Sequence, residues 1–210
     1  IGSNRILLNY ITGVLPELDV YGVSQMTMEQ LFVRLLYEDW DSKIHSICPI
    51  DQKAQDARTR GSVSWFHDLE QFCRDYENSV IPKEEIRLEK NGILLLDEAA
   101  VNRYLEQHQR VSMQEKIHML NQILLSKLEN ELSGKYVSYS PMEKKELQRK
   151  YRRHFGRDVW KGSIFEVYQE FLRSQGQKGK KLSFTDNVFD VYELAALAYL
   201  YKRIKETDGI

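Results

Sequence analysis

Apolar residues near the start of the chain recur at the spacing of a helix. Between Ile6 and Leu15 they follow one another after one, three or four residues, which places them on one helix face. Pro16 cannot continue that helix, so we expect the chain to turn there. The β-branched run at residues 20–26 then predicts a strand. Thr27 is followed three residues later by Gln30, which is the spacing of a capping box for the next helix. Helix, strand and helix make up half of an α/β unit.

Beyond residue 40 the pattern of apolar positions is mainly helical. Gly61 interrupts one helical stretch and Pro82 ends it. The clearest β signal lies at residues 86–96, where Asn91-Gly92 can take the positive φ angles of a tight hairpin turn. Caps and apolar faces predict further helices that begin at Asp97, at Ser112 with Glu115 as a capping box, at Ser140-Pro141, at Ser163 and at Asp190, with a loop at residues 176–181.

The composition is that of a globular protein. Apolar residues make up 42% of the 210 residues and aromatic residues 11%, which is enough for a core. No run approaches the roughly eighteen apolar residues of a membrane span, and the N-terminus lacks the pattern of a secretory signal. We therefore expect a cytoplasmic protein that contacts no membrane. Cys48 and Cys73 are expected to be buried thiols rather than a disulfide.

Charge is distributed unevenly along the chain. Residues 1–134 hold 14 Lys and Arg against 21 Asp and Glu, a net charge of −7; residues 135–181 hold 13 against 5, or +8; residues 182–210 hold 3 against 5, or −2. In the basic part, positive and aromatic side chains are interspersed, a mixture that suits phosphate backbones. The alternatives are a solvated helix face with an aromatic core side, or a surface for an acidic protein. The aromatic residues are Tyr151, Phe155 and Trp160, and the candidate contact residues are Lys150, Arg152, Arg153, Arg157, Trp160 and Lys161.

No self-contained enzyme is predicted. Leu94-Leu95-Leu96-Asp97-Glu98 resembles the magnesium-binding strand end of a nucleotide hydrolase, but the chain has no phosphate loop, and Gly179-Lys180-Lys181 lacks the hydroxyl residue of one. We interpret Asp97 and Glu98 as the acidic start of a helix. The five histidines show no pair at metal-ligand spacing, so we expect no catalytic residue, metal site or cofactor in this chain.

The two ends of the chain contain the residues of a family resemblance. Near the start, Gly2-Ser3-Asn4 and the helix after it are followed by Val14-Leu15-Pro16, and residues 23–27 have the sequence VSQMT. Near the end, residues 190–200 have the sequence DVYELAALAYL. Together these segments resemble a superfamily 1 DNA helicase of the UvrD/Rep-like kind, most closely the HelD group, the helicase IV-like ATPases associated with bacterial RNA polymerase. In that family the first two segments correspond to motifs Ia and Ib, and the last to the helix before the Walker B strand.

The resemblance implies a fold and a division into domains. The expected fold is mainly α with one β-hairpin. Residues 41–185 would form a helical insertion domain, flanked by short pieces of a RecA-like α/β ATPase domain at residues 1–40 and 186–210. Since the flanks would come from one domain, we expect the helix at residues 191–204 to pack against the helix at residues 6–15 or against the strand near Val23.

The resemblance also implies an activity and partners. The parent protein would be an ATP-dependent DNA helicase that hydrolyses ATP with magnesium, whereas this fragment, without Walker A and Walker B motifs, would be inactive. Ser3, Asn4 and Thr27 would contact the backbone of single-stranded DNA, as motifs Ia and Ib do. The inserted domain would contact RNA polymerase, single-stranded DNA or both. The alternative is a protein-interaction module with no nucleic-acid role.

Overall fold

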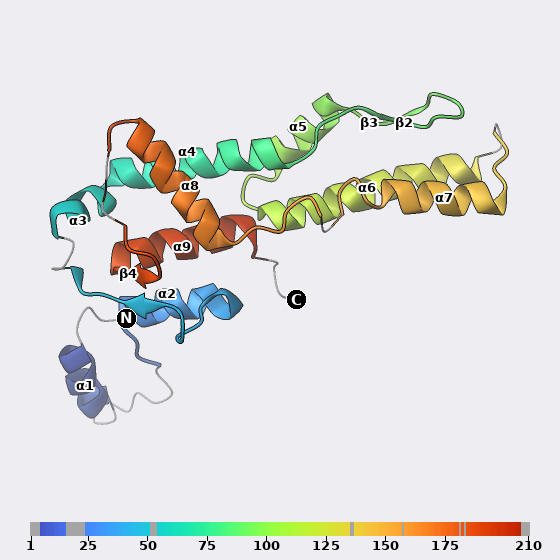
Figure 1. The fold of residues 1–210 in the computed structure, drawn as a ribbon. Coiled ribbons are helices and arrows are strands. Elements are labelled where there is room, and N and C mark those ends of the chain that lie inside the picture. Colours follow the sequence, from blue (N-terminus) through green and yellow to red (C-terminus); the bar gives the residue numbers. More distant parts are fainter. Residues whose placement is uncertain are drawn as a thin grey trace. The chain divides into compact units, whose positions relative to one another are not determined.

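Most of the chain folds into helices, with one antiparallel β-hairpin, as the sequence predicts (Figure 1). The computed structural model describes residues 5–15, 24–50, 54–134, 137–156, 158–180, 182 and 184–206. Within these ranges no helix is both long enough and apolar enough to cross a lipid bilayer. Cys48 and Cys73 are buried thiols that form no disulfide with each other, as predicted.

The residues cluster into two compact units. Unit 1 comprises Ile1–Gln71 and Ser163–Tyr201, and unit 2 comprises Phe72–Gly162 and Lys202–Ile210. Unit 1 is thus built from two separate stretches of sequence, and most of unit 2 lies between them in the chain. The insertion boundaries predicted after residues 40 and 185 come from a family resemblance, whereas these two units are defined by contacts within the fold. The predicted boundaries therefore stay a prediction.

Helices make up most of unit 1, and their N-terminal caps are local. Thr27 Oγ1 accepts a hydrogen bond from Gln30 N–H, and Thr27 N–H donates to Gln30 Oε1, which confirms the predicted capping box. Ser163 and Glu166 form the same box before α8. The elements of unit 1 are α1 (Arg5–Val14), α2 (Met28–Leu36), the 3-10 helix η2 (Tyr37–Asp39), β1 (Ser46–Ile47), α3 (Ala54–Arg60), the first part of α4 (Val63–Val80), α8 (Ile164–Gln177), β4 (Val188–Phe189) and most of α9 (Val191–Ile204).

A short parallel strand pair joins the two stretches of unit 1. β1 pairs with β4 in the register Ser46↔Val188 and Ile47↔Phe189. The pattern beyond residue 41 predicted no further strand outside the hairpin, because strands of two residues are too short to show an alternation. The strand predicted at residues 20–26 lies mostly outside the described residues, and its last three residues do not form a strand.

A buried ion cluster fixes the start of α9. Asp190 Oδ1 accepts a hydrogen bond from Glu193 N–H, and the Glu193 carboxylate accepts one from Asp190 N–H, which completes a capping box. Arg60, at the end of α3, lies 3.6 Å from Asp190 Oδ2 and 3.5 Å from Glu193 Oε1, and all three side chains are fully buried. Burial, with the nearby Glu193 carboxylate, raises the pKa of the Tyr168 hydroxyl well above its ordinary value. The cluster ties both stretches of unit 1 together.

Two predictions about unit 1 are wrong in detail. The predicted apolar face of α1 is largely exposed: Ile6 is 77% and Tyr10 71% exposed, whereas Leu8 is buried. A face exposed to this extent does not support packing of α9 on α1, and the alternative, the strand near Val23, lies outside the described residues. The loop predicted from residue 176 begins later, because α8 continues through Gln177 and buries Gln175.

The long helix α6 (Met113–Ser133) forms the core of unit 2. Its buried residues recur every three or four positions and make one apolar stripe. Ser112 Oγ accepts from Glu115 N–H, half of the predicted capping box, and the helix ends at Gly134 as predicted. α7 (Pro141–Tyr151) lies beside α6 (Figure 1). The stripe consists of Met113, Ile117, Leu120, Leu124, Leu128 and Leu132, and the other elements of unit 2 are the second part of α4, β2 (Ile86–Arg87), β3 (Leu94–Leu96) and α5 (Glu98–Gln107).

The hairpin of β2 and β3 is found where it was predicted, with a different turn. Gly92 has a φ of 68°, whereas Asn91 keeps a negative φ and accepts a hydrogen bond from Ile93 N–H through its Oδ1, at 3.1 Å. The prediction of a tight turn at Asn91-Gly92 is therefore wrong, because the connection between the two strands spans residues 88–93.

Asp97, directly after β3, caps α5. Its Oδ1 accepts a hydrogen bond of 2.7 Å from Ala100 N–H. This confirms the interpretation of Asp97 and Glu98 as the acidic start of a helix.

Candidate functional site

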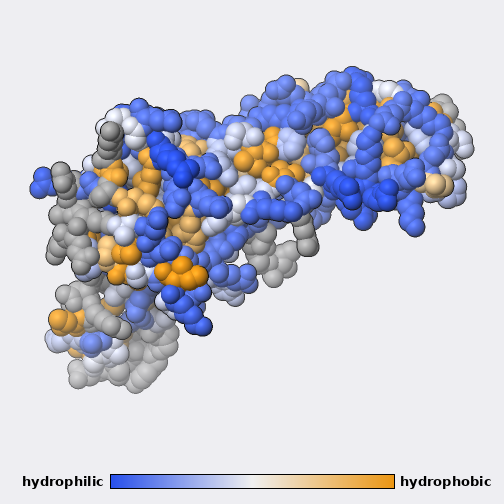
Figure 2. Space-filling model, in the orientation of Figure 1, coloured by the Kyte–Doolittle hydropathy of each residue, from blue (hydrophilic) through white to orange (hydrophobic). Residues whose placement is uncertain are grey.

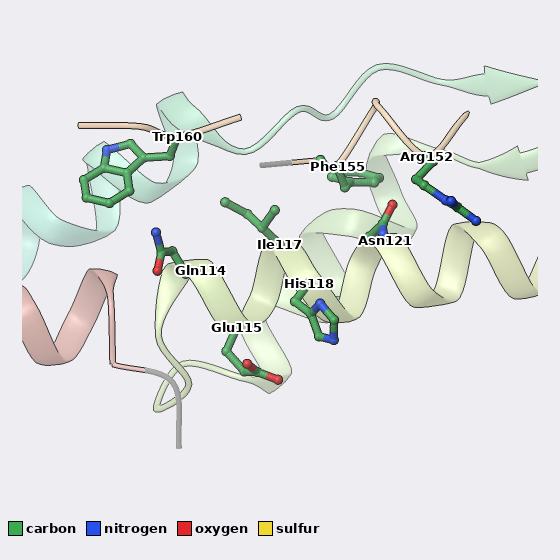
Figure 3. Close-up of a pocket in the computed structure, with 9 residues that line it drawn as sticks. Gln114, Glu115, Ile117, His118, Asn121, Arg152, Phe155 and Trp160 are labelled. Atoms are coloured by element: carbon green, nitrogen blue, oxygen red, sulfur yellow. The ribbon is translucent and has the colours of Figure 1, made fainter. Parts of the chain in front are cut away.

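A groove in unit 2 brings two of the predicted contact residues together. It has a volume of about 890 Å³ and lies between the first half of α6 and the segment that follows α7 (Figure 3). Volumes of roughly 300–1,000 Å³ are typical of ligand sites. The lining residues are Gln114, Glu115, Ile117, His118 and Asn121 of α6, and Arg152, Phe155, Gly156 and Trp160. We name this site the α6 groove.

The α6 groove has an apolar middle and polar groups around it. In Figure 3, Ile117 and Phe155 lie between Trp160 at one end and Arg152 at the other. Arg152 is exposed, and within the described ranges its side chain forms no ion pair. A guanidinium in this state offers five N–H donors to a carboxylate or phosphate.

Asn121, which lines the groove, has a side-chain oxygen that accepts no hydrogen bond within the described part of the chain. Its Oδ1 atom is buried and accepts no hydrogen bond from any residue that the structure describes. Leaving a buried acceptor unpaired costs about 1–3 kcal/mol. His118, one turn earlier on α6, is held by Gln122, with 2.8 Å between His118 Nε2 and Gln122 Nε2.

Trp160 is held in place by two neighbours. Its Nε1–H donates a hydrogen bond of 2.8 Å to Tyr76 OH. A Cβ atom on Gly162 would lie 3.0 Å from the indole nitrogen, so glycine at this position lets the ring lie against the backbone. The indole therefore enters the groove in a fixed orientation, which lowers the entropic cost of binding.

Two aromatic residues of the basic segment belong to the core rather than to a surface. Tyr151 and Phe155 are buried, and Tyr151 OH donates a hydrogen bond of 2.8 Å to the carbonyl oxygen of Arg87. The predicted stacking surface is wrong for these two residues, because bases stack on exposed rings. Arg153, between them in sequence, is exposed.

Two of the predicted basic contacts already have acidic partners. Lys150 Nζ contacts the Glu89 carboxylate, whose hydrogen bond raises the pKa of the lysine, and lies 5.8 Å from the centre of the Tyr151 ring. Lys161 pairs with Asp158. Such exposed pairs contribute little to stability, because water and salt screen them. They nevertheless leave less positive charge for a partner than the sequence indicates.

A second groove lies between the hairpin and α7 and is occupied by paired charges. It has a volume of about 730 Å³. Lys90 Nζ donates to Glu143 at 2.9 Å and to the carbonyl oxygen of Ser138 at 3.0 Å. The backbone N–H of Ser140, together with Lys90, lowers the pKa of the Glu143 carboxyl to about 2. These contacts hold the hairpin on α7, so we assign this groove a structural role.

The other predicted contact residues that the structure describes are not among the residues that line the α6 groove. Thr27 belongs to unit 1, and its hydroxyl caps α2 by accepting from Gln30 N–H at 3.2 Å. Ser3, Asn4 and Arg157 lie outside the described residues. Contacts of these four residues with a partner stay predictions.

The sequence did not reveal the contribution of α6 to the groove. Gln114, His118 and Asn121 are spaced four and three residues apart, which places them on one face of the helix. Any exposed helix face carries polar residues at this spacing, so the pattern does not distinguish a binding site from an ordinary solvated face. Their proximity to Arg152 follows only from the pairing of α6 with the segment after α7.

Among the described residues, no group of three or more His, Cys, Asp and Glu side chains could hold a metal ion. Comparisons with protein-family models, with curated proteins and with solved structures found no match to this chain.

Proposed function

We propose that this chain is the inserted-domain part of an ATP-dependent helicase or translocase of the HelD kind, and that it contributes contact with a protein partner, bacterial RNA polymerase. In this proposal residues 1–40 and 186–210 belong to a RecA-like domain. ATP and magnesium bind elsewhere in the parent protein, so the chain contributes no nucleotide chemistry of its own.

The connectivity of the two units supports an insertion. Phe72–Gly162 lies between the two stretches of unit 1, and the parallel pair of β1 and β4 joins those stretches. The cluster of Arg60 with Asp190 and Glu193 joins them a second time. A segment that leaves one compact unit and returns to it has the connectivity of an inserted domain.

The observation on which the partner contact rests is the α6 groove. Two residues predicted as contacts, Arg152 and Trp160, line it together with the unpaired Asn121 acceptor. A protein partner is favoured over single-stranded DNA for two reasons. Tyr151 and Phe155 are buried and cannot stack on bases, and Glu115 in the groove would repel phosphates.

The same observation favours a second candidate function, a protein-interaction module with no nucleic-acid role. The burial of Tyr151 and Phe155 and the pairing of Lys150 with Glu89 remove features that a nucleic-acid surface needs. The two candidates differ in the partner protein and in the parent's ATPase activity.

Binding of the purified chain to core bacterial RNA polymerase and to an oligo(dT) strand tests the proposal. We expect binding to the polymerase, and association about tenfold slower at low salt for the Arg152→Glu/Arg153→Glu variant. The control is Arg103→Glu/Arg110→Glu, which reverses two exposed charges away from the groove. Oligo(dT) binding that the first variant weakens, with a smaller salt slope, would identify nucleic acid as the partner. No binding to polymerase would contradict the proposal.

A further inference from the structure

The connection between β2 and β3 contains the single Asn-Gly pair of the sequence, Asn91-Gly92. Gly92 is exposed and has a φ of 68°, and Asn91 is partly exposed. The surface over the hairpin and α7 is mainly hydrophilic (Figure 2). Water and hydroxide therefore reach this loop.

An asparagine followed by glycine is able to react with its own backbone. The backbone nitrogen of the glycine attacks the carbon of the side-chain amide, and glycine hinders this attack least because it has no Cβ atom. The nitrogen has to lose its proton and turn towards the asparagine side chain. Asparagine is one of the thermolabile residues of proteins, and this chemistry explains why.

Two hydrogen bonds of the loop act on this reaction in opposite ways. Gly92 N–H donates to the carbonyl oxygen of Leu88 at 2.8 Å, which holds the nitrogen in place while the loop is closed. Ile93 N–H donates to Asn91 Oδ1 at 3.1 Å. That donor stabilises the negative charge that develops on the oxygen during the attack. The first bond has to open before the reaction, whereas the second favours it.

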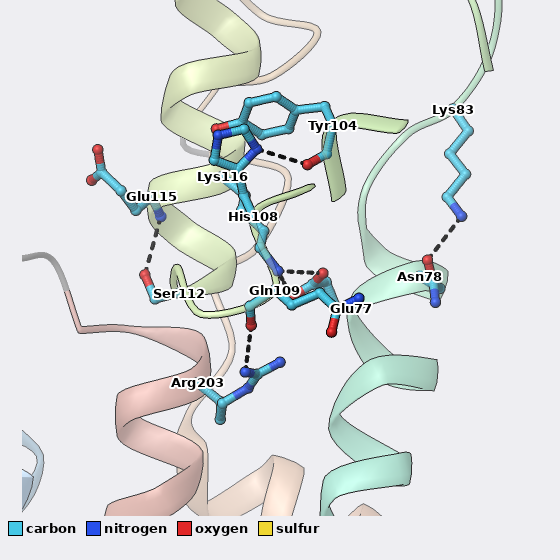
Figure 4. Close-up of polar contacts among 10 residues, drawn as sticks. All are labelled: Glu77, Asn78, Lys83, Tyr104, His108, Gln109, Ser112, Glu115, Lys116 and Arg203. Atoms are coloured by element: carbon cyan, nitrogen blue, oxygen red, sulfur yellow. Dashed lines mark hydrogen bonds and ion pairs between the residues drawn. The ribbon is translucent and has the colours of Figure 1, made fainter. Parts of the chain in front are cut away.

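Asn78-Ser79, near the end of α4, provides a comparison within unit 2. Asn78 is exposed, and its Oδ1 also accepts a hydrogen bond, which comes from Lys83 Nζ at 3.0 Å (Figure 4). Ser79, however, lies within the helix, where its N–H takes part in the helical hydrogen bonds. The two asparagines thus differ in the residue that follows and in the backbone that has to move.

We propose that Asn91 is a site of spontaneous deamidation, and that opening of the hairpin loop controls its rate. The Gly92 nitrogen gives its proton to hydroxide and forms a bond to Asn91 Cγ. The bond between Cγ and the side-chain nitrogen breaks, and this nitrogen takes a proton from water and leaves as ammonia. Water then opens the resulting succinimide. Cleavage of the new bond gives aspartate, and cleavage of the original peptide bond gives isoaspartate, in which the chain continues through the side chain.

Isoaspartate changes the loop that positions Lys90. It inserts one methylene group into the chain directly after Lys90 and adds a carboxylate. Lys90 holds the hairpin on α7 through Glu143 and the carbonyl oxygen of Ser138, and Arg87 donates to the carbonyl oxygen of Gly92 at 3.0 Å. We expect isoaspartate to weaken these contacts. The reaction is independent of the proposed function, because it needs neither an enzyme nor a partner.

Incubation of the full chain at mildly alkaline pH, followed by digestion at acidic pH and peptide mapping by mass spectrometry, provides the test. We expect Asn91 to convert roughly tenfold or more faster than Asn78, at a rate that rises with the hydroxide concentration. Isoaspartyl methyltransferase should label the product at residue 91, because a succinimide gives isoaspartate as well as aspartate. Equal rates at the two asparagines, or aspartate without isoaspartate, would overturn the proposal.

Two variants test whether opening of the loop controls the rate. Lys90→Gln removes the ion pair with Glu143, and we expect Asn91 to convert about threefold or more faster because the hairpin opens more often. The control is Lys127→Gln, which removes an exposed lysine from α6 and should convert like wild type. Circular dichroism verifies that both variants are folded. Equal rates in the two variants would contradict control by the hairpin.

A comparison of two products tests the effect on the hairpin. Asn91→Asp keeps a side-chain acceptor for Ile93 N–H and the normal backbone, whereas isoaspartate at residue 91 does not keep that backbone. The isoaspartate form, separated from the incubated chain by ion exchange, should therefore unfold at a lower temperature than Asn91→Asp. Identical unfolding temperatures would show that the modification leaves the contacts of Lys90 intact.

Discussion

Lys116 Nζ donates hydrogen bonds of 2.7 and 2.8 Å to the two carboxylate oxygens of Glu77 (Figure 4). Lys116 lies on the buried side of α6 and is only 1% exposed. Burial lowers the pKa of its ammonium group, and the Glu77 carboxylate partly offsets that effect. The pair joins α6 to the second part of α4. The packing of these two helices in unit 2 therefore depends on a buried ammonium group whose charge is balanced by the Glu77 carboxylate.

Removal of Lys116 should destabilise unit 2 strongly. Lys116→Met leaves the Glu77 carboxylate buried without its cation, and we expect a loss of about 3–5 kcal/mol in the free energy of unfolding. Urea denaturation followed by circular dichroism measures it. Lys116→Met/Glu77→Gln removes both charges and should recover part of the loss. A loss below about 1 kcal/mol in the single variant would show that the pair does not hold α6 on α4.

The Arg60 cluster should have the same importance in unit 1. Arg60→Met leaves Asp190 and Glu193 facing each other without a counter-charge, which should cost roughly 3–5 kcal/mol. Amide hydrogen exchange should show that the first turns of α9 lose protection before α6 does. The control is Arg58→Met, which removes an exposed charge from the same helix. Equal effects of the two substitutions would contradict the assigned role of the cluster.

Loss of the hydroxyl should destabilise the protein at only one of two buried tyrosines of unit 2. Tyr151→Phe removes the hydrogen bond to the carbonyl oxygen of Arg87 and should cost about 0.5–1.5 kcal/mol. Tyr139 OH is buried and has no hydrogen-bond partner among the described residues, so Tyr139→Phe should be neutral or stabilising. Thermal unfolding of the two variants side by side provides the measurement. A larger loss for Tyr139→Phe than for Tyr151→Phe would refute this prediction.

Stability should fall as the pH decreases below about 6.5. Burial lowers the pKa of His154, which packs edge-on against Phe155 at 4.7 Å, so the unfolded chain binds a proton at a higher pH than the folded protein. The contribution of neutral His154 is therefore complete above the unfolded pKa and is lost as the pH falls towards the lower folded pKa. Urea midpoints across this range measure the effect. His154→Gln should flatten the dependence and leave the part due to His45, whose pKa is also lowered by burial.

Much of the helical structure was predictable because its signals are local. Thr27, Asp97, Ser112, Ser140 and Ser163 each cap a helix by accepting a hydrogen bond from a residue no more than three positions ahead. Such a bond is encoded in a few consecutive residues, and so is an apolar stripe at intervals of three and four. The turn at Asn91-Gly92 was predicted in position but not in type, because packing of the hairpin decides the length of its connection.

The candidate site was predictable only in part. Arg152 and Trp160 stand out in sequence as a cation and an aromatic ring within one basic segment, and both line the α6 groove. Asn121 did not stand out, because its importance depends on being buried without a donor. Lys150 seemed available because Glu89, which pairs with it, is 61 residues away in the chain.

The sequence by itself determined where most helices begin and end, which residues form the stripe of α6, and where positive charge accumulates. Only the tertiary structure decided which of these charges remain without a partner, and it alone pairs Ser46–Ile47 with Val188–Phe189. The physical reason is the range of the interactions. A cap or a helical stripe involves neighbours along the chain, whereas a pair between strands 142 positions apart, a buried Lys116–Glu77 pair and a groove between two segments depend on contacts that form when the whole chain packs.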